Sequence, residues 1–229
     1  MTAGVVLPAG GSGTRMAVEG APSKQFRLLG GASVLVQTLR AFARHRAIGP
    51  AVVVAPAPDL EAVVDDLVRA DLEAVVVEGG ATRQASVANG VRALEGVGMV
   101  LVHDAVRPFI PQAVITSVLE AAATHGAAAA ALPVADTLRQ GGAGPLFGET
   151  VPRDGLWTMQ TPQAARRDWL LRAHANAAGH VATDEVGLLQ RAGYPVRIVE
   201  GDARNVKITR PSDWAMATAL WPAWTEAEG

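Results

Sequence analysis

Residues 5–16 read VVLPAGGSGTRM, and this stretch indicates both the fold class and the kind of ligand. A short apolar run leads directly into a loop with Gly10, Gly11 and Gly13 within four positions, followed by Arg15. Such a loop leaves backbone N–H groups free to surround a phosphate, as loops after a β-strand commonly do. The stretch therefore predicts a strand followed by a polyphosphate-binding loop.

The familiar glycine motifs do not match this loop. A dinucleotide fingerprint requires GxGxxG, but the window that starts at Gly11 reads GSGTRM and places Met16 where the third glycine belongs. No window supplies the GxxxxGK followed by serine or threonine of a P-loop. Lys24 follows Arg15 by nine residues, and two cations beside a nucleoside triphosphate can neutralise charge that develops at phosphorus. Transfer chemistry at phosphorus is favoured, with an NAD-binding oxidoreductase as an alternative.

Outward from the loop, short valine-rich runs alternate with longer segments of helical period. This alternation is typical of an α/β fold with a parallel sheet. The expected strands are Gly4–Leu7, Ala51–Ala55, Ala74–Val77, Met99–His103, Ala127–Leu132 and Val196–Val199. The expected helices are Ser33–Arg46, Leu60–Ala70, Arg83–Leu94, Gln112–His125, Arg166–Ala178, Asp184–Arg191 and Ser212–Leu220.

The segment TLRQGGAGPLFGETVPRDGLW, residues 137–157, interrupts this alternation. Glycine and proline divide it into pieces too short for helices, so it is expected to be a loop or an extended excursion from the sheet. A disordered surface loop is one interpretation. The other is an arm that packs on a second subunit, which is favoured by its apolar residues Leu146, Phe147, Val151, Leu156 and Trp157.

The composition excludes several classes of function. The chain has 229 residues, of which 49% are hydrophobic, so it can form one domain with a large core. A net charge of -2 provides no basic field for nucleic acid or an anionic membrane. The absence of cysteine excludes disulfides, thiolate nucleophiles and cysteine-ligated metals. Because no secretory leader or apolar run of about 20 residues is present, we expect a cytoplasmic protein.

Lysine is rare in this chain. Of 20 cationic residues, 18 are arginine, and the two lysines are Lys24 and Lys207. Genome composition explains the preference for arginine but does not explain the two exceptions. A compact ammonium fits a narrow phosphate site that a planar guanidinium would not enter. We therefore expect both lysines to be functional.

Polar clusters follow other expected strands, at the carboxyl ends where parallel α/β sheets bind ligands. Residues 78–87 read EGGATRQASV, in which Arg83 and Ser86 fit either nucleotide contact or the ordinary chemistry of a helix N-terminus. Residues 103–109 read HDAVRPF, and the carboxylate of Asp104 suits magnesium beside a triphosphate. No histidine lies at ligand spacing from His103, so a packed or hydrogen-bonded histidine is expected there.

Two further clusters occur late in the chain. Thr183 precedes two acids in the sequence TDE, which fits a helix cap as well as a ligand contact. Lys207 lies in the β-branched stretch NVKIT and is expected to point from a strand toward the site.

Taken in order, LPAGGSGTRM, PSKQF, VEGGATRQASV, LVHDAVRPF, VPRDGLW, TPQ, TDE and NVKITRP resemble the motifs of the 2-C-methyl-D-erythritol 4-phosphate cytidylyltransferase family. The resemblance covers nearly the whole chain. It implies a Rossmann-like three-layer sandwich with a mostly parallel central sheet and a projecting β-arm. Residues 1–229 would form a single nucleotidyltransferase domain, with 137–157 as the dimerisation arm.

The same resemblance implies the reaction. The enzyme would transfer cytidylyl from CTP to 2-C-methyl-D-erythritol 4-phosphate in non-mevalonate isoprenoid biosynthesis, release pyrophosphate, use Mg²⁺ and act as a homodimer. Because the acceptor phosphate is already anionic, no general base is required.

Roles for individual residues also follow from the resemblance. The catalytic residues would be Arg15, Lys24 and Lys207, the first two stabilising the pentacoordinate transition state. The nucleotide would contact Pro8, Ala9, Gly10, Gly11, Gly13, Gly79, Gly80, Ser86, Asp104 and Ala105, and Asp104 would also bind the metal. The acceptor would contact Arg107, Thr137, Arg153, Thr161 and Thr183, with Arg153 reaching across the dimer.

Two positions depart from the family pattern. Gly10 stands where alanine is usual and loosens the backbone there, and Ala81 stands where an acid is common and removes one ribose contact. Two alternatives remain open at this point. The acceptor could be another sugar or polyol phosphate, or the chain could be a noncatalytic nucleotide-binding protein.

Overall fold

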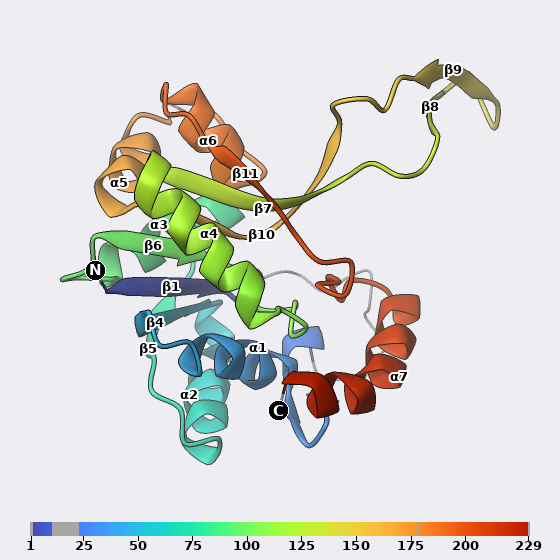
Figure 1. Cartoon of the computed structure of the whole chain (residues 1–229). Coiled ribbons are helices and arrows are strands. Elements are labelled where there is room, and N and C mark those ends of the chain that lie inside the picture. The colour runs from blue at the N-terminus through green and yellow to red at the C-terminus, as the bar shows by residue number, and fades with distance from the viewer. Residues whose placement is uncertain (1, 11–22, 178, 229) are drawn as a thin grey trace.

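The structure is a computed structural model that describes residues 2–10, 23–177 and 179–228. Its described part contains a seven-stranded sheet in the order β11-β7-β10-β6-β1-β4-β5 (Figure 1). These strands are β1 (Ala3–Pro8), β4 (Ile48–Ala55), β5 (Val75–Glu78), β6 (Met99–Val102), β7 (Ala127–Pro133), β10 (Trp157–Arg166) and β11 (Arg197–Glu200). Only β10 runs antiparallel to its neighbours, β6 and β7. The predicted mostly parallel sheet is confirmed.

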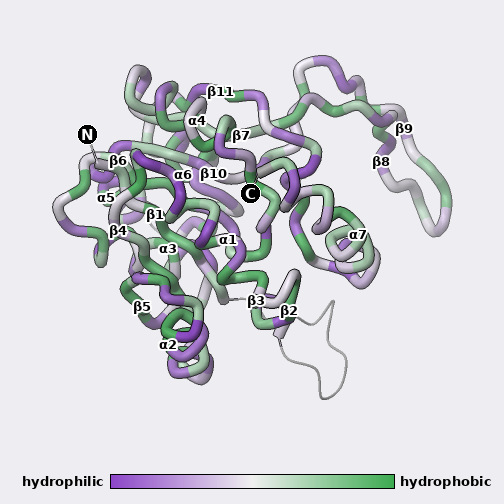
Figure 2. Tube along the Cα trace, turned by 60° about the horizontal axis from the view of Figure 1, so that its bottom comes forward, coloured by the Kyte–Doolittle hydropathy of each residue, from purple (hydrophilic) through white to green (hydrophobic). Residues whose placement is uncertain are grey.

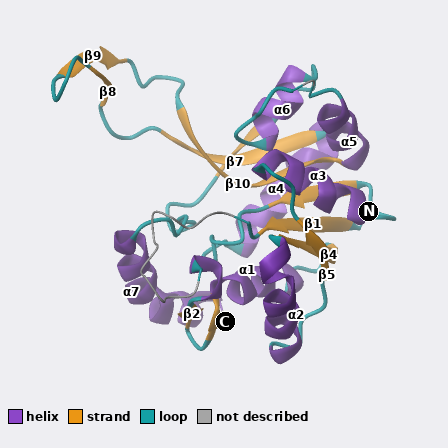
Figure 3. Cartoon of the chain, turned by 180° about the vertical axis from the view of Figure 1, so that it is seen from behind, coloured by secondary structure: helices purple, strands orange, loops and turns teal. Residues whose placement is uncertain are grey.

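Helices cover both faces of this sheet (Figure 3). They are α1 (Val34–Ala43), α2 (Leu60–Arg69), α3 (Arg83–Ala93), α4 (Gln112–His125), α5 (Arg167–Ala175), α6 (Glu185–Arg191) and α7 (Pro211–Glu228). In β1, Val5 and Leu7 pack with α1, α2 and α4, whereas Val6 packs with α3, α5 and α6. This alternation of side chains along each strand produces the three layers.

The expected elements are present, but several details differ from the predictions. Helix α7 continues through Pro222 to Glu228 instead of ending at Leu220. Helix α5 begins at Arg167 and ends at Ala175, and position 178 lies outside the described residues. Strand β10 was not predicted, because the sequence WTMQTPQAAR carries a proline and polar side chains where a buried strand is usually apolar. The short antiparallel pairing of β2 (Leu28–Leu29) with β3 (Ala32–Ser33) was also not predicted.

Residues 137–157 form the expected excursion from the sheet. Strands β8 (Leu138–Gly141) and β9 (Phe147–Val151) pair as an antiparallel hairpin that projects from the body of the protein (Figure 1). Hydrophobic segments lie along this arm in Figure 2, and Phe147 is 84% exposed. Packing of the arm on a second subunit remains a prediction.

None of the helices within the described residues combines the length and the apolar character that a membrane crossing requires. Helix α7, the longest of them, packs Trp224 against Phe109 with the two rings edge to face at 5.5 Å.

Close contact between α3 and the sheet predicts the effect of one substitution. A methyl group at Gly90 would lie 2.5 Å from Val6 Cγ1 and 2.8 Å from Val54 Cγ2. Overpacking of this kind costs about 1–3 kcal/mol, and alanine gains roughly 1 kcal/mol over glycine in a helix, so a net loss of about 1 kcal/mol is expected. We expect Gly90→Ala to lower the melting temperature by about 2–4 °C in calorimetry. In Gly187→Ala, where the nearest atom is 3.4 Å away, the melting temperature should not fall; equal behaviour of the two variants would contradict the packing.

Candidate active site

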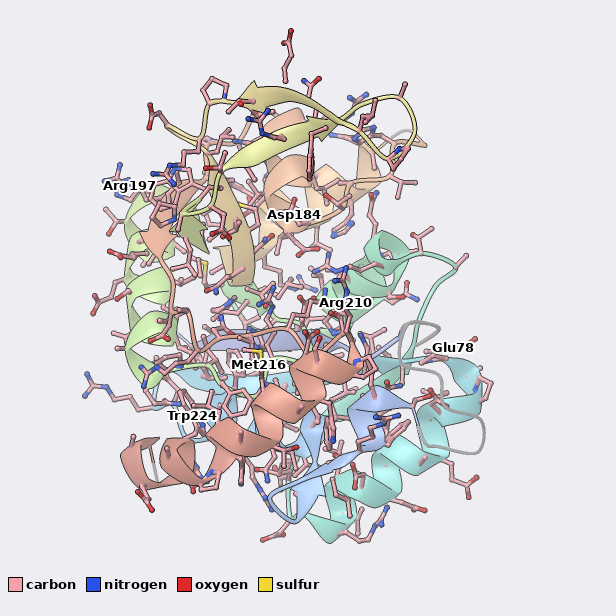
Figure 4. The ribbon with its side chains drawn as sticks, turned by 90° about the vertical axis from the view of Figure 1, so that its right-hand side faces the viewer. Glu78, Asp184, Arg197, Arg210, Met216 and Trp224 are labelled. Atoms are coloured by element: carbon pink, nitrogen blue, oxygen red, sulfur yellow. The ribbon has the colours of Figure 1, made fainter. Side chains whose placement is uncertain are left out.

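The loops that follow β1, β5 and β6 meet at one edge of the sheet, because these strands and β4 run parallel. Figure 4 views this edge from the side of the arm and labels Glu78 at the end of β5, Asp184 before α6 and Arg210 before α7. The arrangement brings together three stretches that are far apart in the sequence, residues 8–10, 79–86 and 103–107.

A buried carboxylate with three cations forms the centre of this edge. Asp104 Oδ2 lies 3.0 Å from Lys207 Nζ and 3.2 Å from Arg107 Nε, and Oδ1 lies 3.7 Å from Arg83 Nη2. Burial by itself would raise the pKa of Asp104, but the charges of Lys207, Arg83 and Arg107 outweigh it and lower the pKa well below its usual range. Asp104 is therefore ionised throughout the neutral pH range.

The segment that carries Lys207 is fixed against the loop after β6. Ile208 N donates to Val106 O at 3.0 Å, and Arg107 Nη1 donates to Asn205 O at 2.7 Å. The expected strand position of Lys207 is wrong, because residues 201–209 belong to no strand and are held by these separate contacts. Lys207 nevertheless points at the cluster, as its ion pair with Asp104 shows.

Behind Asp104 lies a fully buried histidine. His103 Nε2 lies 3.0 Å from Arg107 O, which can only accept, so Nε2 carries the proton and Nδ1 accepts from Thr161 Oγ1 at 3.0 Å. Thr161 Oγ1 in turn accepts from Asp104 N at 3.1 Å. Burial lowers the pKa of His103 to about 4, so the ring is neutral at pH 7. The expected hydrogen-bonded histidine is confirmed, and the Thr161 hydroxyl is engaged inside the protein.

Three cavities at this edge share lining residues, which shows that they lie side by side. The glycine cavity, about 440 Å³, is lined by Pro8, Gly10, Pro56, Ala57, Gly79, Gly80, Ala81, Thr82, Arg83 and Ser86. The central cavity, about 160 Å³, is lined by Pro8, Ala9, Gly10, Lys24, Gln25, Arg83, Asp104, Val106 and Lys207. The α7 cavity, about 430 Å³, has Arg107, Lys207 and Arg210 among its lining residues. Arg83 therefore borders the first two cavities, and Lys207 borders the last two.

The wall of the glycine cavity requires glycine at two positions. A Cβ atom at Gly79 would lie 2.9 Å from Ser86 Oγ, and one at Gly80 would lie 2.5 Å from Ala85 Cβ. The hydroxyl of Ser86 accepts from Gly80 N at 3.1 Å and donates to Thr82 O at 2.9 Å. Ser86 thus shapes this loop, and the loop leaves a hollow beside β5.

Lys24 lies on a short 3-10 turn, Lys24–Phe26, beside the central cavity. Its neighbour Gln25 is buried and Phe26 packs against the main core, so the turn has a fixed base. Arg15, Gly11 and Gly13 were predicted to act beside Lys24, and they lie outside the described residues.

The predicted acceptor residues are not all near the cluster. Arg107 and Thr161 belong to it, but Thr137 and Arg153 lie on the projecting arm, directly before β8 and shortly after β9, and are exposed. The expected cap at Thr183 is wrong: Asp184 caps α6 by accepting from Gly187 N at 2.9 Å, and Thr183 is exposed. Ala105 is buried behind the site, where its carbonyl accepts from Thr38 Oγ1 at 3.0 Å.

The sequence left Arg83 between nucleotide contact and the ordinary chemistry of a helix N-terminus, and it gave Glu185 no role at the site. Arg83 forms a bidentate pair with Glu185, with distances of 2.9 and 3.1 Å, and Glu185 is 2% exposed. The sequence holds a cue for each residue, because Arg83 follows the double glycine and Glu185 follows Asp184. It gives no cue for their pairing, since 102 positions separate them. Only the fold brings them together.

A mostly parallel α/β sheet with a glycine-walled cavity, converging cations and an ionised carboxylate at its carboxyl edge is the arrangement expected of a nucleotidyltransferase. The comparisons with known proteins agree. The family profile described as IspD: 2-C-methyl-D-erythritol 4-phosphate cytidylyltransferase matches residues 3–222. The chain therefore belongs to this family of cytidylyltransferases, which act in isoprenoid precursor biosynthesis.

Individual relatives support the assignment. The chain is 50% identical to a protein of that name from Salinibacter ruber, over 97% of the chain and 94% of the relative. It is 46% identical to another from Deinococcus radiodurans, over 98% and 93%. A crystal structure of the enzyme from Thermus thermophilus superimposes with a TM-score of 0.81 and 39% identity, covering 97% of this chain and all of that one. The predicted family, fold and class of enzyme are confirmed.

Proposed function

We propose that the three cavities carry out the reaction of the family, the transfer of the cytidylyl group of CTP to 2-C-methyl-D-erythritol 4-phosphate. The observation that supports this assignment is their order: the central cavity, with Lys24, Arg83, Asp104 and Lys207, lies between two cavities of about 440 and 430 Å³. The nucleoside would occupy the glycine cavity and the acceptor the α7 cavity. Their phosphates would then meet in the central cavity.

In this arrangement a phosphate oxygen of the acceptor attacks the α-phosphorus of CTP. The new P–O bond forms as the bond from the α-phosphorus to the bridging oxygen of the β-phosphate breaks, and pyrophosphate leaves with that electron pair. Lys207 borders the central and α7 cavities and would neutralise the acceptor phosphate, while Lys24, with Arg15, would stabilise the charge on the transferring group. The site provides position and positive charge rather than a base.

Magnesium fits the donor set around Asp104. Mg²⁺ commonly takes one or two carboxylates and completes its shell with phosphate oxygens and water. Asp104 is ionised, and Arg83 Nη2 lies 3.7 Å from its Oδ1. No cluster of three or more metal-binding side chains occurs in the described ranges, so the triphosphate would supply the remaining ligands. When bound, the ion would offset charge on the triphosphate and its pyrophosphate product.

The proposal includes a cytoplasmic homodimer of one-domain subunits. Arg153, with Thr137 beside it on the arm, would reach the acceptor from the second subunit, and Thr183 would contact it from the first. Thr161 is buried and bonded to His103 and Asp104, so it would support the site from behind. Exposed apolar residues on the arm support an interface there, since Leu146 is 69% and Phe147 84% exposed.

Pyrophosphate release tests the proposed reaction. We would measure it with CTP, ATP, GTP and UTP in the presence of Mg²⁺, each with and without 2-C-methyl-D-erythritol 4-phosphate. Release with CTP that depends on the acceptor is expected. If CTP binds in the presence of Mg²⁺ but no pyrophosphate appears, the acceptor assignment is wrong and other polyol phosphates become the substrates to test.

The proposed contribution of the arm can be tested by mixing two variants. Arg153→Ala and Lys24→Ala should each be nearly inactive alone. In a two-fold dimer that shares its sites, a 1:1 mixture of exchanging subunits should recover about a quarter of the wild-type rate, because half of the dimers carry one intact site. No recovery, in a mixture shown by mass spectrometry to contain heterodimers, would place the arm outside the partner's site.

A further inference from the structure

Arg83 occupies a position that the roles proposed so far do not explain. It lines both the glycine cavity and the central cavity, and its side chain is 29% exposed. In a bound nucleoside triphosphate, the α-phosphate is the group between the ribose and the outer phosphates. If the nucleoside occupies the glycine cavity as proposed, Arg83, which borders both cavities, lies beside the group that reacts.

The guanidinium of Arg83 is held from one side. Nη1 and Nη2 donate to the two carboxylate oxygens of Glu185, and this fork-to-fork contact fixes the plane of the guanidinium. Two of the five N–H groups of the side chain are thus used. Within the described part of the chain, the other three have no hydrogen-bond acceptor, although Asp104 Oδ1 lies 3.7 Å from Nη2.

Glu185 is itself fixed by a buried framework. Gln163, on β10, accepts through Oε1 from the backbone N–H groups of Glu185 and Val186 at 2.9 and 3.2 Å. The Nε2 atom of Gln163 donates to Asp184 Oδ2 at 3.1 Å. The first turn of α6 is therefore attached to the central sheet, and the carboxylate of Glu185 has a defined position before any ligand binds.

Glu185 and Asp104 are both close enough to attract the guanidinium of Arg83. Arg83 could neutralise Asp104 directly, since both are in the central cavity, but Glu185 holds both of its terminal nitrogens at hydrogen-bonding distance. Burying an ion pair is costly, so the pair is weak evidence for a purely stabilising role. The pair with Glu185 holds Arg83 beside the central cavity and leaves three of its N–H groups available to a ligand.

We infer that Arg83 contacts substrate by donating to a non-bridging oxygen of the α-phosphate of CTP, and that Glu185 is the residue that positions it. The inference rests on the proposed function. It adds Arg83 to Lys24 as a cation of the described residues at the reacting phosphorus, while Lys207 serves the acceptor phosphate. Glu185 touches no substrate in this arrangement and acts only through Arg83.

Replacement of the whole pair separates a structural role from substrate contact. Arg83→Met alone leaves the charge of Glu185 buried and should destabilise the protein. Arg83→Met with Glu185→Met replaces the pair by apolar side chains, so the melting temperature should return close to that of the wild type. We nevertheless expect kcat/KM for CTP to stay about 100-fold lower, as for loss of a donor to the reacting group. Recovery of both stability and kcat/KM would overturn the inference.

A sulfur-substituted nucleotide tests the contact at the proposed atom. The two diastereomers of cytidine 5′-O-(1-thiotriphosphate) place sulfur at one or the other non-bridging position of the α-phosphate. The wild-type enzyme should distinguish them, and the double variant and Arg83→Lys should each change the rate ratio about tenfold. An unchanged ratio in both variants would refute the contact, and Arg83→Lys keeps the test decisive if the double variant does not fold.

The control is a second ion pair, on the exposed surface of α5. In it, Arg172 Nη2 lies 3.3 Å from Asp168 Oδ2. Arg172→Met with Asp168→Met should alter neither the rate ratio nor kcat/KM. Turnover of CTP by the wild type is measured first in the same assay. Its absence would refute the proposed function, whereas a normal wild type with an unaltered ratio in the Arg83 variants would refute only this inference.

Discussion

Lys24→Ala should lower kcat about 100- to 1000-fold while weakening CTP binding less than tenfold. The reason is the position of Lys24, which lines the small central cavity and not the larger glycine cavity where the nucleoside would bind. A cation in the central cavity interacts most strongly with charge that develops as the bond to pyrophosphate breaks. Steady-state kinetics with saturating acceptor gives kcat, and calorimetric titration gives the dissociation constant of CTP.

Two further variants, Lys24→Arg and Arg69→Ala, separate the effect of charge and shape at Lys24 from a general loss of positive charge. Lys24→Arg keeps the charge but places a planar guanidinium in a cavity of about 160 Å³, so activity should stay well below that of the wild type. Arg69→Ala removes an exposed cation of α2, which pairs with Asp66 at 3.8 Å, and should leave both constants unchanged. Equal losses in binding and turnover for Lys24→Ala would show that the lysine binds substrate and transition state alike.

Asp104→Asn should affect both activity and stability. The substitution keeps the shape of the side chain but leaves Lys207, Arg107 and Arg83 without their shared counter-ion, and it removes the proposed metal ligand. Removing one partner from a buried charge cluster costs about 3–5 kcal/mol, so urea unfolding at pH 7 should show a loss near 3 kcal/mol. We expect kcat to fall at least about 100-fold.

The stability difference should depend on pH in a defined direction. The folded-state pKa of Asp104 lies far below its unfolded value of about 4, so its ionisation stabilises the folded protein fully above that value. The gap between wild type and Asp104→Asn should therefore be constant from pH 8 to about pH 5 and should shrink as pH falls below about 4. Asp168→Asn, on the exposed surface of α5, should show no such gap. A gap that widened in acid would contradict the charge assignment.

The sequence predicted the elements whose pattern is local and missed those that depend on distant partners. Valine-rich runs identified β1, β4 and β6 because these strands bury apolar side chains on both faces. Strand β10 instead buries Gln160 and Gln163, whose side chains bond the segments near residues 202 and 185. A buried glutamine is satisfied only once the fold exists, so its sequence gives no strand signal.

The same distinction holds for the site. Residues that follow a strand, such as Asp104 and Gly79, were predicted because the ends of parallel strands converge. The pairing of Arg83 with Glu185 could not be predicted from spacing. Helix α7 continues past Pro222, although proline usually ends a helix, and the tryptophans on either side of it, Trp221 and Trp224, pack against Phe109.

The antiparallel insertion of β10 also has a consequence for the order of events during synthesis. Strands β6 and β7 are not paired with each other, because β10 occupies the place between them. Until residues 157–166 leave the ribosome, the apolar strands β6 and β7 therefore lack a neighbour that satisfies their facing backbone groups. Unpaired strand edges recruit other chains. Nascent chains that stop short of β10 should aggregate, whereas those that extend through it can close the sheet.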